Sequence, residues 1–536
     1  MSVLAQVTPI EMPAIDWAAT APLWIVFTGA CVSVLLEAFL PRHQRWPVQV
    51  LVTGLTLVAA LLALAGYALS GPAAVLTFGS ALSVDSPSLF LWGTLIVLAI
   101  PSLLLIADRS VEPGGVFVAS AAERAAARTG GGSSPAAGGP PEHVDRSYGA
   151  PDEAPTMQTE PFPFVLFALG GMMAFVAAND LLTMFIALEV LSLPLYLMCG
   201  LARRRRLLSQ ESAVKYFLLG AFGSAFFLYG IALLYGYAGS VRLSAISQAT
   251  AGTLASDTLL FAGLALLLVG LLFKGSVAPF HTWTPDVYQG APTPVTAFMA
   301  ACTKVAAFGA IARVLYVAFG STVWEWRGVL WVVAVVSMVV GAVLGLTQTD
   351  VKRMIAYSSI AHAGFILLGA MALTPQGTAG LLFYLLAYGF TTVAVFGIVS
   401  LVRTSDGEAS DLAAWAGLAK RSPLVAGIMT FLLLALAGIP LTSGFTAKFA
   451  VFSAASADGM VPLVVIALVA SAVAAFFYLR IVVLMYFSEP AEDGPAVVVP
   501  GAFTTVAITL GTLATLVLGI LPTPVLEWAA SGAFAG

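Results

Sequence analysis

The sequence predicts an all-α polytopic membrane protein, and three observations support this fold class. The 536-residue chain is 60% hydrophobic. Only 9% of its residues are charged, against about 25% in soluble domains. The apolar residues gather in runs that reach the roughly 20 residues a helix needs to cross a bilayer. Alternating segments of about ten residues, which are typical of a transmembrane β-barrel, are absent from the sequence.

The apolar runs predict about 14 transmembrane helices in chain order. The first of them is expected to stay in the mature protein, because the N-terminus MSVLAQVTPIEMP has no basic region typical of a cleaved signal peptide. The predicted helices cover residues 17–40, 48–69, 89–107, 162–178, 181–201, 213–237, 258–284, 294–319, 329–347, 354–373, 379–402, 424–456, 460–487 and 503–527.

The basic residues predict the orientation of these helices. Alternate loops collect 15 lysines and arginines on one side of the membrane and only Arg242 and Arg327 on the other. Without the long loop at 109–160 the ratio is still 11 to two. The basic side faces the cytoplasm under the positive-inside rule, so both termini are expected on the extracytoplasmic side. The basic side holds Arg42, Arg45, four arginines of that loop, Arg203 to Arg206, Lys352, Arg353, Arg403, Lys420 and Arg421.

Residues 109–160 differ in composition from the rest of the chain. They are rich in Gly, Ala, Ser and Pro, polar and mixed in charge, so we expect a disordered cytoplasmic loop. A glycine-rich phosphate-binding loop is the alternative, but these glycines neither follow a strand nor open a helix in a known pattern. The three cysteines, Cys31, Cys199 and Cys302, stand singly and are expected to pack as small apolar residues.

Two of the predicted helices contain residues that break helices. The seventh places Pro279 shortly after Lys274, and the twelfth reads LLLALAGIPLTSGFTAKF, with Pro440 and Gly444 before Lys448. Proline removes a backbone donor and clashes with the preceding turn. Irregular backbone at membrane depth is tolerated only inside protein or beside a wet cavity. Two broken helices five positions apart predict inverted five-helix repeats, helices 4–8 and 9–13, as in transporters.

The chain is therefore expected to divide into five parts. These are an N-terminal three-helix part at 1–108, the loop at 109–160, a first repeat at 161–320, a second repeat at 321–490, and a C-terminal helix at 491–536.

Ionisable residues inside the predicted helices are the candidates for function. A charge at mid-bilayer costs about 2.5–3.5 kcal/mol, so such residues must face the protein interior or water. Glu189, Lys274, Lys304 and Lys448 lie too deep to reach a headgroup easily. The full set is Glu189, Lys215, Lys274, Lys304, Arg313, His362, Lys448 and Arg480, with His281 beside the first break.

Several of these residues have a structural alternative. Lys215 could form an ordinary i,i+4 pair with Glu211. Arg313 and Arg480 could snorkel or pair locally, and Glu37 could be a solvated helix end. Each of the two histidines, His281 and His362, could be a hydrogen-bonded core residue or a member of a proton relay.

Proton transfer fits this set of residues better than other chemistry. A metal site needs clustered His, Cys or carboxylate ligands, and hydrolysis needs a nucleophile–base–acid set at recognisable spacing. Burial favours the neutral form of a lysine, whereas a nearby carboxylate favours its charged form. A series such as Glu189–Lys274–Lys304–Lys448 can therefore hold and release protons. The two broken helices would give it short wet paths to each membrane face.

Five motifs carry a resemblance to a known family. They are FKGSVAPFHTWTPDVYQGAPTPVTAF (273–298), ALEVLSLPLYL (187–197), KYFLLGAF (215–222), DVKRMIAYSSIAHAGF (350–365) and SGFTAKF (443–449). Over residues 160–490 the sequence resembles the antiporter-like membrane subunits of NADH-quinone oxidoreductase, respiratory complex I. Lysine at position 448 resembles the subunit N group, since subunits M and L carry an acidic residue there. The long loop at 109–160 departs from the family, in which this loop is usually much shorter.

The resemblance implies a function for the chain. It implies fourteen transmembrane helices with inverted repeats, and proton translocation driven by quinone reduction elsewhere in the complex. Glu189, Lys215, Lys274, Lys304 and Lys448 match the family's relay positions, and His281 and His362 fall at motif positions with less defined roles. Helix breaks are implied at Pro279, Pro440 and Gly444.

The resemblance also implies partners and cofactors. The partners are other membrane subunits of complex I, especially subunit M and the small subunits K and J, and membrane lipid, without nucleic acid. NADH, FMN, iron–sulfur clusters and quinone are expected on partner subunits, with no cofactor or metal bound to this chain. The expected location is a bacterial plasma (inner) membrane. An Mrp-type cation/proton antiporter and a scaffold without transport of its own are the alternatives.

Overall fold

The structure is a computed structural model that describes residues 14–111, 158–202, 206–252, 257–404, 407–490 and 496–536. The described chain is almost entirely helical, and the predicted fold class of an α-helical polytopic membrane protein is confirmed. Within these residues, 12 helices are long and apolar enough to cross a membrane, and two further apolar helices, α5 and α17, are shorter.

The helices lie close to the ranges predicted from hydrophobicity. They are α1 (Trp17–Phe39), α2 (Arg42–Leu69), α3 (Ser86–Ala107), α5 (Pro161–Ala177), α6 (Leu181–Cys199), α7 (Arg206–Ala238), α8 (Leu243–Gly252), α9 (Asp257–Lys274), α10 (Trp283–Gly290), α11 (Thr293–Phe298), α12 (Lys304–Arg313), α13 (Val323–Leu346), α14 (Val351–Met371), α15 (Pro375–Leu401), α16 (Leu418–Arg421), α17 (Pro423–Ala437), α18 (Ser443–Ala457), α19 (Val461–Phe487), α20 (Ala502–Ile520) and α21 (Thr523–Ala530). Two π-helical turns, η1 (Met299–Thr303) and η2 (Val314–Ala318), flank α12, and short 3₁₀ turns, η3 (Gly320–Thr322) and η4 (Leu412–Trp415), lie in two connections.

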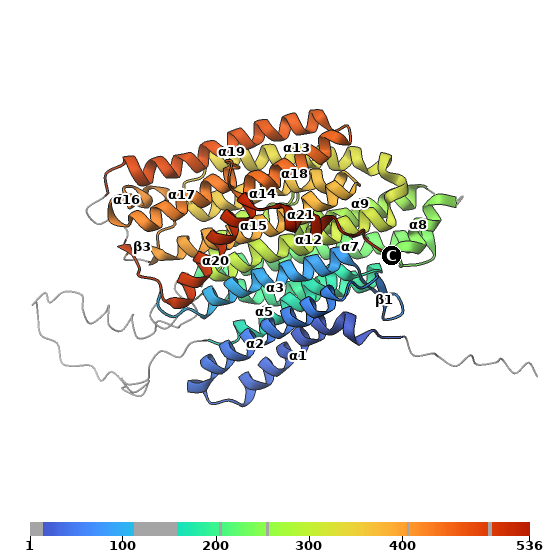
Figure 1. The fold of residues 1–536 in the computed structure, drawn as a ribbon, viewed down its shortest axis with the longest axis horizontal. Coiled ribbons are helices and arrows are strands. Elements are labelled where there is room, and N and C mark those ends of the chain that lie inside the picture. Colours follow the sequence, from blue (N-terminus) through green and yellow to red (C-terminus); the bar gives the residue numbers. More distant parts are fainter. Residues whose placement is uncertain (1–13, 112–157, 203–205, 253–256, 405–406, 491–495) are drawn as a thin grey trace, which may run out of the picture.

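Short strands lie at the two ends of the helix bundle (Figure 1). At one end, β1 (Val75–Thr77) pairs antiparallel with β2 (Leu82–Val84), with Val75 opposite Val84. At the other end, β3 (Val402–Thr404) pairs antiparallel with both β4 (Gly407–Glu408) and β5 (Ala496–Val497).

The start of α1 and the C-terminal residues lie at the same end of the bundle as β1. The backbone N–H of Asp16 donates to Thr77 Oγ1 at 3.0 Å. The backbone N–H of Ala535 donates to Asp85, the N-cap residue of α3, at 2.8 Å. An even number of membrane crossings would place both termini at one end in this way.

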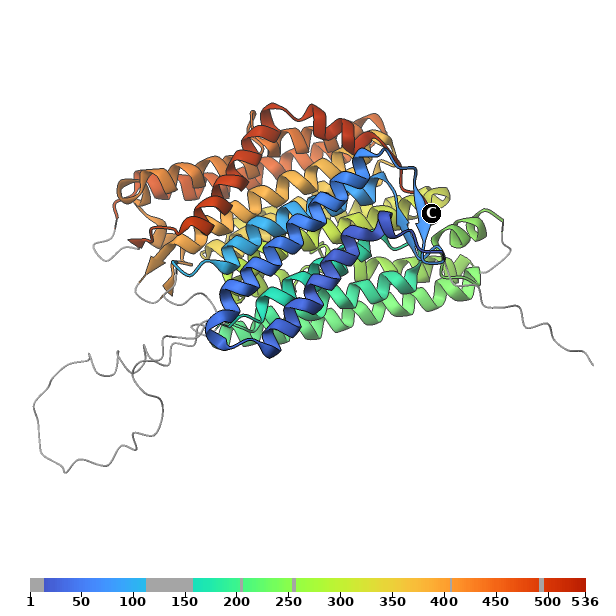
Figure 2. The same ribbon diagram turned by 60° about the horizontal axis from the view of Figure 1, so that its bottom comes forward.

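The core of the bundle is formed by α14, α15 and the segment 293–318 that contains α11 and α12, all of which are almost completely buried. By contrast, α2, α7, α13, α19 and α20 turn much of their surface outward, and that surface carries leucine, valine and phenylalanine. In the rotated view, α1, α2 and α3 lie side by side across the front of the bundle (Figure 2). Three of the candidate residues, Lys304, Arg313 and His362, lie on these protected segments.

Glycines allow neighbouring helices to come close together. A Cβ added at Gly171 of α5 would lie 2.5 Å from the backbone nitrogen of Leu191 in α6. A Cβ at Gly230 of α7 would lie equally close to the backbone of Leu267 in α9. Small residues at helix contacts are a usual feature of membrane proteins, where packing rather than the hydrophobic effect holds helices together.

Two sequence expectations need correction. Glu37 is not a solvated helix end: it accepts hydrogen bonds from Arg45 at 2.9 Å, Gln49 at 3.1 Å and Thr159 at 2.7 Å, because α1, α2 and the start of α5 converge there. The C-terminal part contains two helices rather than one, since α20 ends shortly before Pro522 and α21 follows it.

Most of the loop predicted at 109–160 lies outside the described residues, because residues 112–157 are not among them. The five-part division of the chain and the inverted relation of the two repeats stay predictions.

Candidate functional site

The apolar stretch that contains the seventh predicted helix is interrupted in the structure. α9 ends at Lys274 and α10 begins at Trp283, so Pro279 lies in the interruption. The indole Nε1 of Trp283 donates to the backbone carbonyl of Phe273 at 3.0 Å, which ties the two half-helices together. The break therefore exposes helix-end backbone groups next to a lysine.

Lys274 is buried among hydroxyl groups and aromatic rings. Its Nζ donates to Ser192 Oγ of α6 at 2.7 Å and to Tyr216 OH of α7 at 3.1 Å. The same atom lies 5.6 Å from the ring centre of Tyr196 and 5.1 Å from that of Tyr216, within the range of cation–π attraction. Among the described residues, Lys274 forms no ion pair, so its ammonium group is held by neutral partners.

Lys304 is the first residue of α12 and follows directly after the π-helical turn η1. Its Nζ donates to the backbone carbonyl of Ser359 in α14 at 3.0 Å and to that of Gly275 at 3.4 Å. Because Gly275 is the residue after Lys274, Lys304 reaches the interruption at the point where α9 ends. Isolated π-helical turns are often found at functional sites.

His362 lies one turn after Ser359 on α14 and is buried between tyrosines. Its Nδ1 is 2.7 Å from Tyr384 OH of α15, and its Nε2 is 3.4 Å from Tyr478 OH of α19. The Tyr478 hydroxyl also hydrogen-bonds with Ser358. Both ring nitrogens therefore face groups that can donate or accept a proton.

The twelfth predicted helix is interrupted as well. α17 ends at Ala437 and α18 begins at Ser443, so Pro440 lies between the two halves. Gly444 lies in the first turn of α18 and not in the interruption itself. A Cβ at Gly444 would lie 1.9 Å from the carbonyl oxygen of Ala435, so this glycine lets α18 approach the end of α17.

Lys448 of α18 turns back toward the interrupted end of α17. Its Nζ donates to the carbonyls of Ala437 at 2.8 Å and Leu436 at 3.0 Å, and to Ser471 Oγ of α19 at 2.8 Å. The last four carbonyls of a helix have no partner within the helix, and the helix dipole places negative charge there. The break in α17–α18 therefore supplies acceptors that a buried cation needs.

Four of the predicted residues form one series through the protein interior, which we call the buried row: Lys274, Lys304, His362 and Lys448. The interrupted end of α9 accepts from Lys304, and the interrupted end of α17 accepts from Lys448. His362 is one turn after Ser359, which accepts from Lys304, and its ring packs against Phe365, whose ring centre lies 5.2 Å from Lys448 Nζ. The buried row thus connects helices of both predicted repeats.

Glu189 lies beside the buried row without a direct contact to it. It is three residues before Ser192, on the same face of α6, and is half-buried. Its Oε1 is buried and has no hydrogen-bond partner among the described residues. Among the described residues no hydrogen bond joins Glu189 to Lys274, whose partner on α6 is Ser192.

Lys215 lies outside the buried row, in a partly exposed ion cluster. It pairs with Glu211 at 2.7 Å, as the i,i+4 alternative predicts, and with Asp286 of α10 at 2.6 Å. Asp286 also pairs with Arg353 at the start of α14 at 2.6 Å. The next residue, Tyr216, is buried and contacts Lys274, so consecutive residues of α7 belong to the ion cluster and contact the buried row.

His281 lies in the first interruption and is only partly buried. Its ring packs against Tyr357 of α14 with 6.4 Å between ring centres. Its Nδ1 is buried without a partner among the described residues. The structure therefore places His281 near the break but does not join it to the buried row.

Hydroxyl groups are the part of this site that the sequence reasoning missed. Ser192, Tyr216, Tyr384, Tyr478 and Ser471 contact the lysines and the histidine of the buried row. The spacing from Glu189 to Ser192 places both on one helix face and could have indicated Ser192. The other four come from helices distant in sequence and gave no such signal.

The described residues contain no group of three His, Cys, Asp or Glu side chains that could hold a metal ion. Two of the cysteines, Cys199 and Cys302, are buried, and Cys31 is exposed. The chemistry available at the buried row is the exchange of protons between amines, an imidazole and hydroxyl groups.

Comparison with known proteins places this arrangement in context. The family model described as NADH:quinone oxidoreductase/Mrp antiporter, transmembrane, matches residues 178–474. A protein of Saccharopolyspora erythraea named NADH-quinone oxidoreductase subunit N is 68% identical over 98% of this chain and 99% of its own length. A protein of Mycobacterium bovis with the same name is 51% identical over 97% of this chain and 98% of its own length.

Solved structures show the same fold. A chain of respiratory complex I from Thermus thermophilus is similar with a TM-score of 0.73 and 33% identity, over 96% of this chain and 100% of that one. A chain of the Mrp complex from Dietzia sp. DQ12-45-1b has a TM-score of 0.76 at 22% identity, over 96% of this chain and 97% of that one. The second likeness is one of fold alone.

Proposed function

This chain belongs to the NADH:quinone oxidoreductase/Mrp antiporter family, as a subunit N-type membrane subunit of the proton-translocating NADH-quinone oxidoreductase, and we propose that it moves protons along the buried row. The observation that carries the proposal is the setting of the three lysines. Lys274, Lys304 and Lys448 are each at most 6% exposed, and within the described residues each is held by hydroxyls or backbone carbonyls without an ion pair.

The partners of these lysines allow the loss of a proton, which the carboxylate partner of a structural ion pair disfavours. A lysine paired with a carboxylate is held in its charged form, whereas one held by neutral acceptors can lose its proton without leaving an unpaired anion. Two neighbouring lysines that are both charged repel each other in the low-dielectric interior. Protonation of one member of the row therefore favours release from the next.

We assign a role to each predicted residue on this basis. Lys274 receives a proton at the first interruption, and Glu189 acts on it electrostatically through its position one turn from Ser192. Lys304 carries the proton to His362, whose two nitrogens face Tyr384 and Tyr478. Lys448 releases it at the second interruption. Lys215 and His281 stand near the entry to the row, where Asp286 and Tyr357 hold them.

The proposal extends to the surroundings of the chain. We place it in the bacterial plasma membrane with both termini on the extracytoplasmic side, as the distribution of basic residues predicts. NADH, FMN, iron–sulfur clusters and quinone belong to partner subunits, so that quinone reduction outside this chain drives the row. Subunits M, K and J are the proposed membrane neighbours.

Lysine variants test the relay in the assembled complex. Lys304→Met and Lys448→Met are expected to abolish the contribution of this chain to NADH-driven proton uptake, measured by dye quenching in inside-out membrane vesicles. Lys420→Met is the matched control, because Lys420 is half-exposed and pairs with Glu489 at 2.6 Å on the surface. Normal proton uptake in an assembled Lys304→Met and Lys448→Met complex would contradict the relay and support the scaffold alternative.

The Mrp-type alternative rests on fold likeness at 22% identity, whereas the subunit N proteins reach 68%. The two functions make different predictions for the purified chain in liposomes. We expect no exchange of Na⁺ or K⁺ for protons without quinone reduction. Rapid quinone-independent exchange would overturn the assignment.

A further inference from the structure

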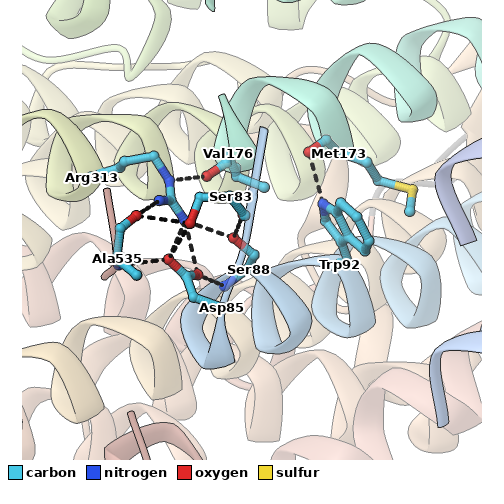
Figure 3. A network of polar contacts seen from close by, with 8 residues as sticks. All are labelled: Ser83, Asp85, Ser88, Trp92, Met173, Val176, Arg313 and Ala535. Carbon is cyan, nitrogen blue, oxygen red and sulfur yellow. Dashed lines mark hydrogen bonds and ion pairs between the residues drawn. The ribbon is translucent and has the colours of Figure 1, made fainter. Parts of the chain in front are cut away.

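Arg313, the last residue of α12, has a fully buried guanidinium group whose three nitrogens all donate hydrogen bonds (Figure 3). Nε donates to the carbonyl of Val176 at the end of α5 at 2.7 Å. Nη1 donates to the carbonyl of Ala535 at 3.0 Å. Nη2 donates to both oxygens of Asp85, at 2.8 and 2.9 Å, and to Ser88 Oγ at 2.6 Å. Arg313 is therefore not a snorkelling residue but the centre of a buried cluster.

Asp85 is as fully engaged as its partner. Besides the guanidinium, its carboxylate accepts from the backbone N–H of Ser88 at 2.9 Å and from the backbone N–H of Ala535 at 2.8 Å. Burial alone would raise the pKa of Asp85, but the Arg313 charge and these hydrogen bonds hold it below its ordinary value. The carboxylate thus stays ionised.

The C-terminal residues cover this pair from outside. The Phe534 ring lies over the guanidinium, with 5.1 Å from Arg313 Cζ to the ring centre, and packs against Tyr316. Ser83 Oγ donates to the Ala535 carbonyl at 2.8 Å, so that carbonyl is held by two donors. Phe534 and Ala535 therefore form a cover over the pair.

The position of the pair along α12 relates it to the buried row. Lys304 and Arg313 stand at the two ends of this helix, about 14 Å apart at the usual rise per residue. All eight residues between them are apolar or glycine, and the seven with a side chain, alanines, valine, isoleucine and phenylalanine, are fully buried. A proton that left Lys304 along α12 toward the termini would next meet Arg313.

We propose that Arg313, Asp85 and the cover of Phe534 and Ala535 form a proton seal at the end of the bundle that carries the termini. An arginine cannot give up its proton in a protein, so it cannot relay one. A fixed positive charge in a dry passage also repels an incoming hydrated proton, as arginines do in water-selective channels. The proposal rests on the proposed relay: with the seal in place, a proton on Lys304 stays within the buried row.

The seal is tested by the passive proton permeability of membrane vesicles that contain the assembled complex, without NADH. The double variant Arg313→Met/Asp85→Asn removes both charges together and keeps an N-cap acceptor for α3. We expect the decay of an imposed pH gradient to become several-fold faster. Arg313→Lys keeps a positive charge and should leak less than the double variant. Ser531→Ala loses two exposed hydrogen bonds at the same end, one with Ser86 Oγ and one to the Trp528 carbonyl, and should not leak.

A second change shows whether the leak passes through the row. Adding Lys304→Met to the double variant should restore a slow decay. A leak that persists in this triple variant, or a folded double variant as tight as the unmodified protein, would overturn the seal. If the double variant fails to assemble, deletion of residues 532–536 removes the cover alone, and tight vesicles would then also overturn it. A different result would show that the relay itself is wrong: the single variant Lys304→Met would then show normal NADH-driven proton uptake.

Discussion

The contact between Gly444 and the end of α17 gives a prediction that separates packing from chemistry. Gly444→Ala would place a Cβ 1.9 Å from the Ala435 carbonyl oxygen, whereas ordinary contacts begin at 3.4 Å. The neighbouring atoms are backbone and cannot turn aside, so α17 and α18 must part by about 1.5 Å at this point. Overpacking of this kind costs about 1–3 kcal/mol.

The displacement acts on Lys448, four residues further along α18. In the unmodified protein, the Nζ of Lys448 lies 2.8 Å from the Ala437 carbonyl and 3.0 Å from that of Leu436. A shift of about 1.5 Å carries both distances beyond the roughly 3.2 Å limit of an N–H···O hydrogen bond. We therefore expect Gly444→Ala to reduce the initial rate of NADH-driven proton uptake several-fold, although the substituted residue carries no ionisable group.

Gly427→Ala is the matched control for this measurement. Gly427 lies in α17 of the same broken helix, and a Cβ there meets no atom within 4 Å. Alanine in a helix interior is better than glycine by about 0.5–1 kcal/mol, so this variant should pump normally and be as stable as the unmodified protein or slightly more so. Equal proton uptake and equal thermal stability in Gly444→Ala and Gly427→Ala would refute the argument that the second break positions Lys448.

Three further predictions concern other parts of the site. Ser192→Ala removes one of two hydroxyl acceptors of Lys274; since a hydrogen bond to a charged group is worth about 1.5–3 kcal/mol, proton uptake should slow by about tenfold or more. An unchanged uptake rate would show that proton transfer does not depend on the hydrogen bond from Lys274 to Ser192. Asp286→Asn breaks two partly exposed ion pairs, each worth about 0.2–1 kcal/mol, so the melting temperature should fall by about 1–2 °C at low salt and by less at high salt. A salt-independent loss would point to another cause. Burial alone would raise the pKa of Asp108, but its hydrogen bonds from Ser110 and the backbone of Thr504 lower it. A carboxyl group whose pKa is lower in the folded protein than in the unfolded chain stabilises the fold at any pH above its unfolded-state pKa, which is near 4. This stabilisation is lost as the pH falls through the pKa of the group in the folded protein. The unmodified protein should therefore melt higher than Asp108→Asn at pH 7, and the gap should close under acid conditions; a gap independent of pH would contradict this.

The sequence was informative wherever the physical rule is local. Hydrophobic runs of bilayer length predicted where the helices lie, and prolines predicted both interruptions, because each depends on consecutive residues. The cost of a charge in the membrane also singled out Lys274, Lys304 and Lys448, all of which are buried. These predictions required no knowledge of which helices are neighbours.

The sequence was uninformative wherever partners come from distant segments. Asp85 and Arg313 are 228 positions apart, and no pattern in either helix predicts their contact. Lys215 has its expected neighbour Glu211, but the shorter contact is to Asp286, 71 positions away. The sequence predicted a helix break at Gly444, but the structure places this glycine in the first turn of α18. Its role is to leave room for the carbonyl of Ala435 on the other side of the interruption, which the sequence could not indicate.

Five buried cations differ in their partners, and the difference bears on the proposed relay and the proposed seal: Arg313, Lys352, Lys274, Lys304 and Lys448. Arg313 pairs with the carboxylate of Asp85 at 2.8 Å. Lys352 donates to the Ala291 carbonyl and to Thr293 Oγ1, each at 3.0 Å, and also lies 3.5 Å from the carboxylate of Glu408. The lysines of the buried row have hydroxyls and backbone carbonyls and, within the described residues, no carboxylate partner. A carbonyl accepts from an ammonium group but carries no charge, so the energy that holds the proton is smaller and depends on the neighbouring lysines. Interrupting a helix presents free carbonyls inside a membrane, because carbonyls in the interior of an intact helix already have a partner in that helix. The two broken helices therefore supply acceptors to Lys304 and Lys448, and an ion pair at the same positions would convert the row into a seal.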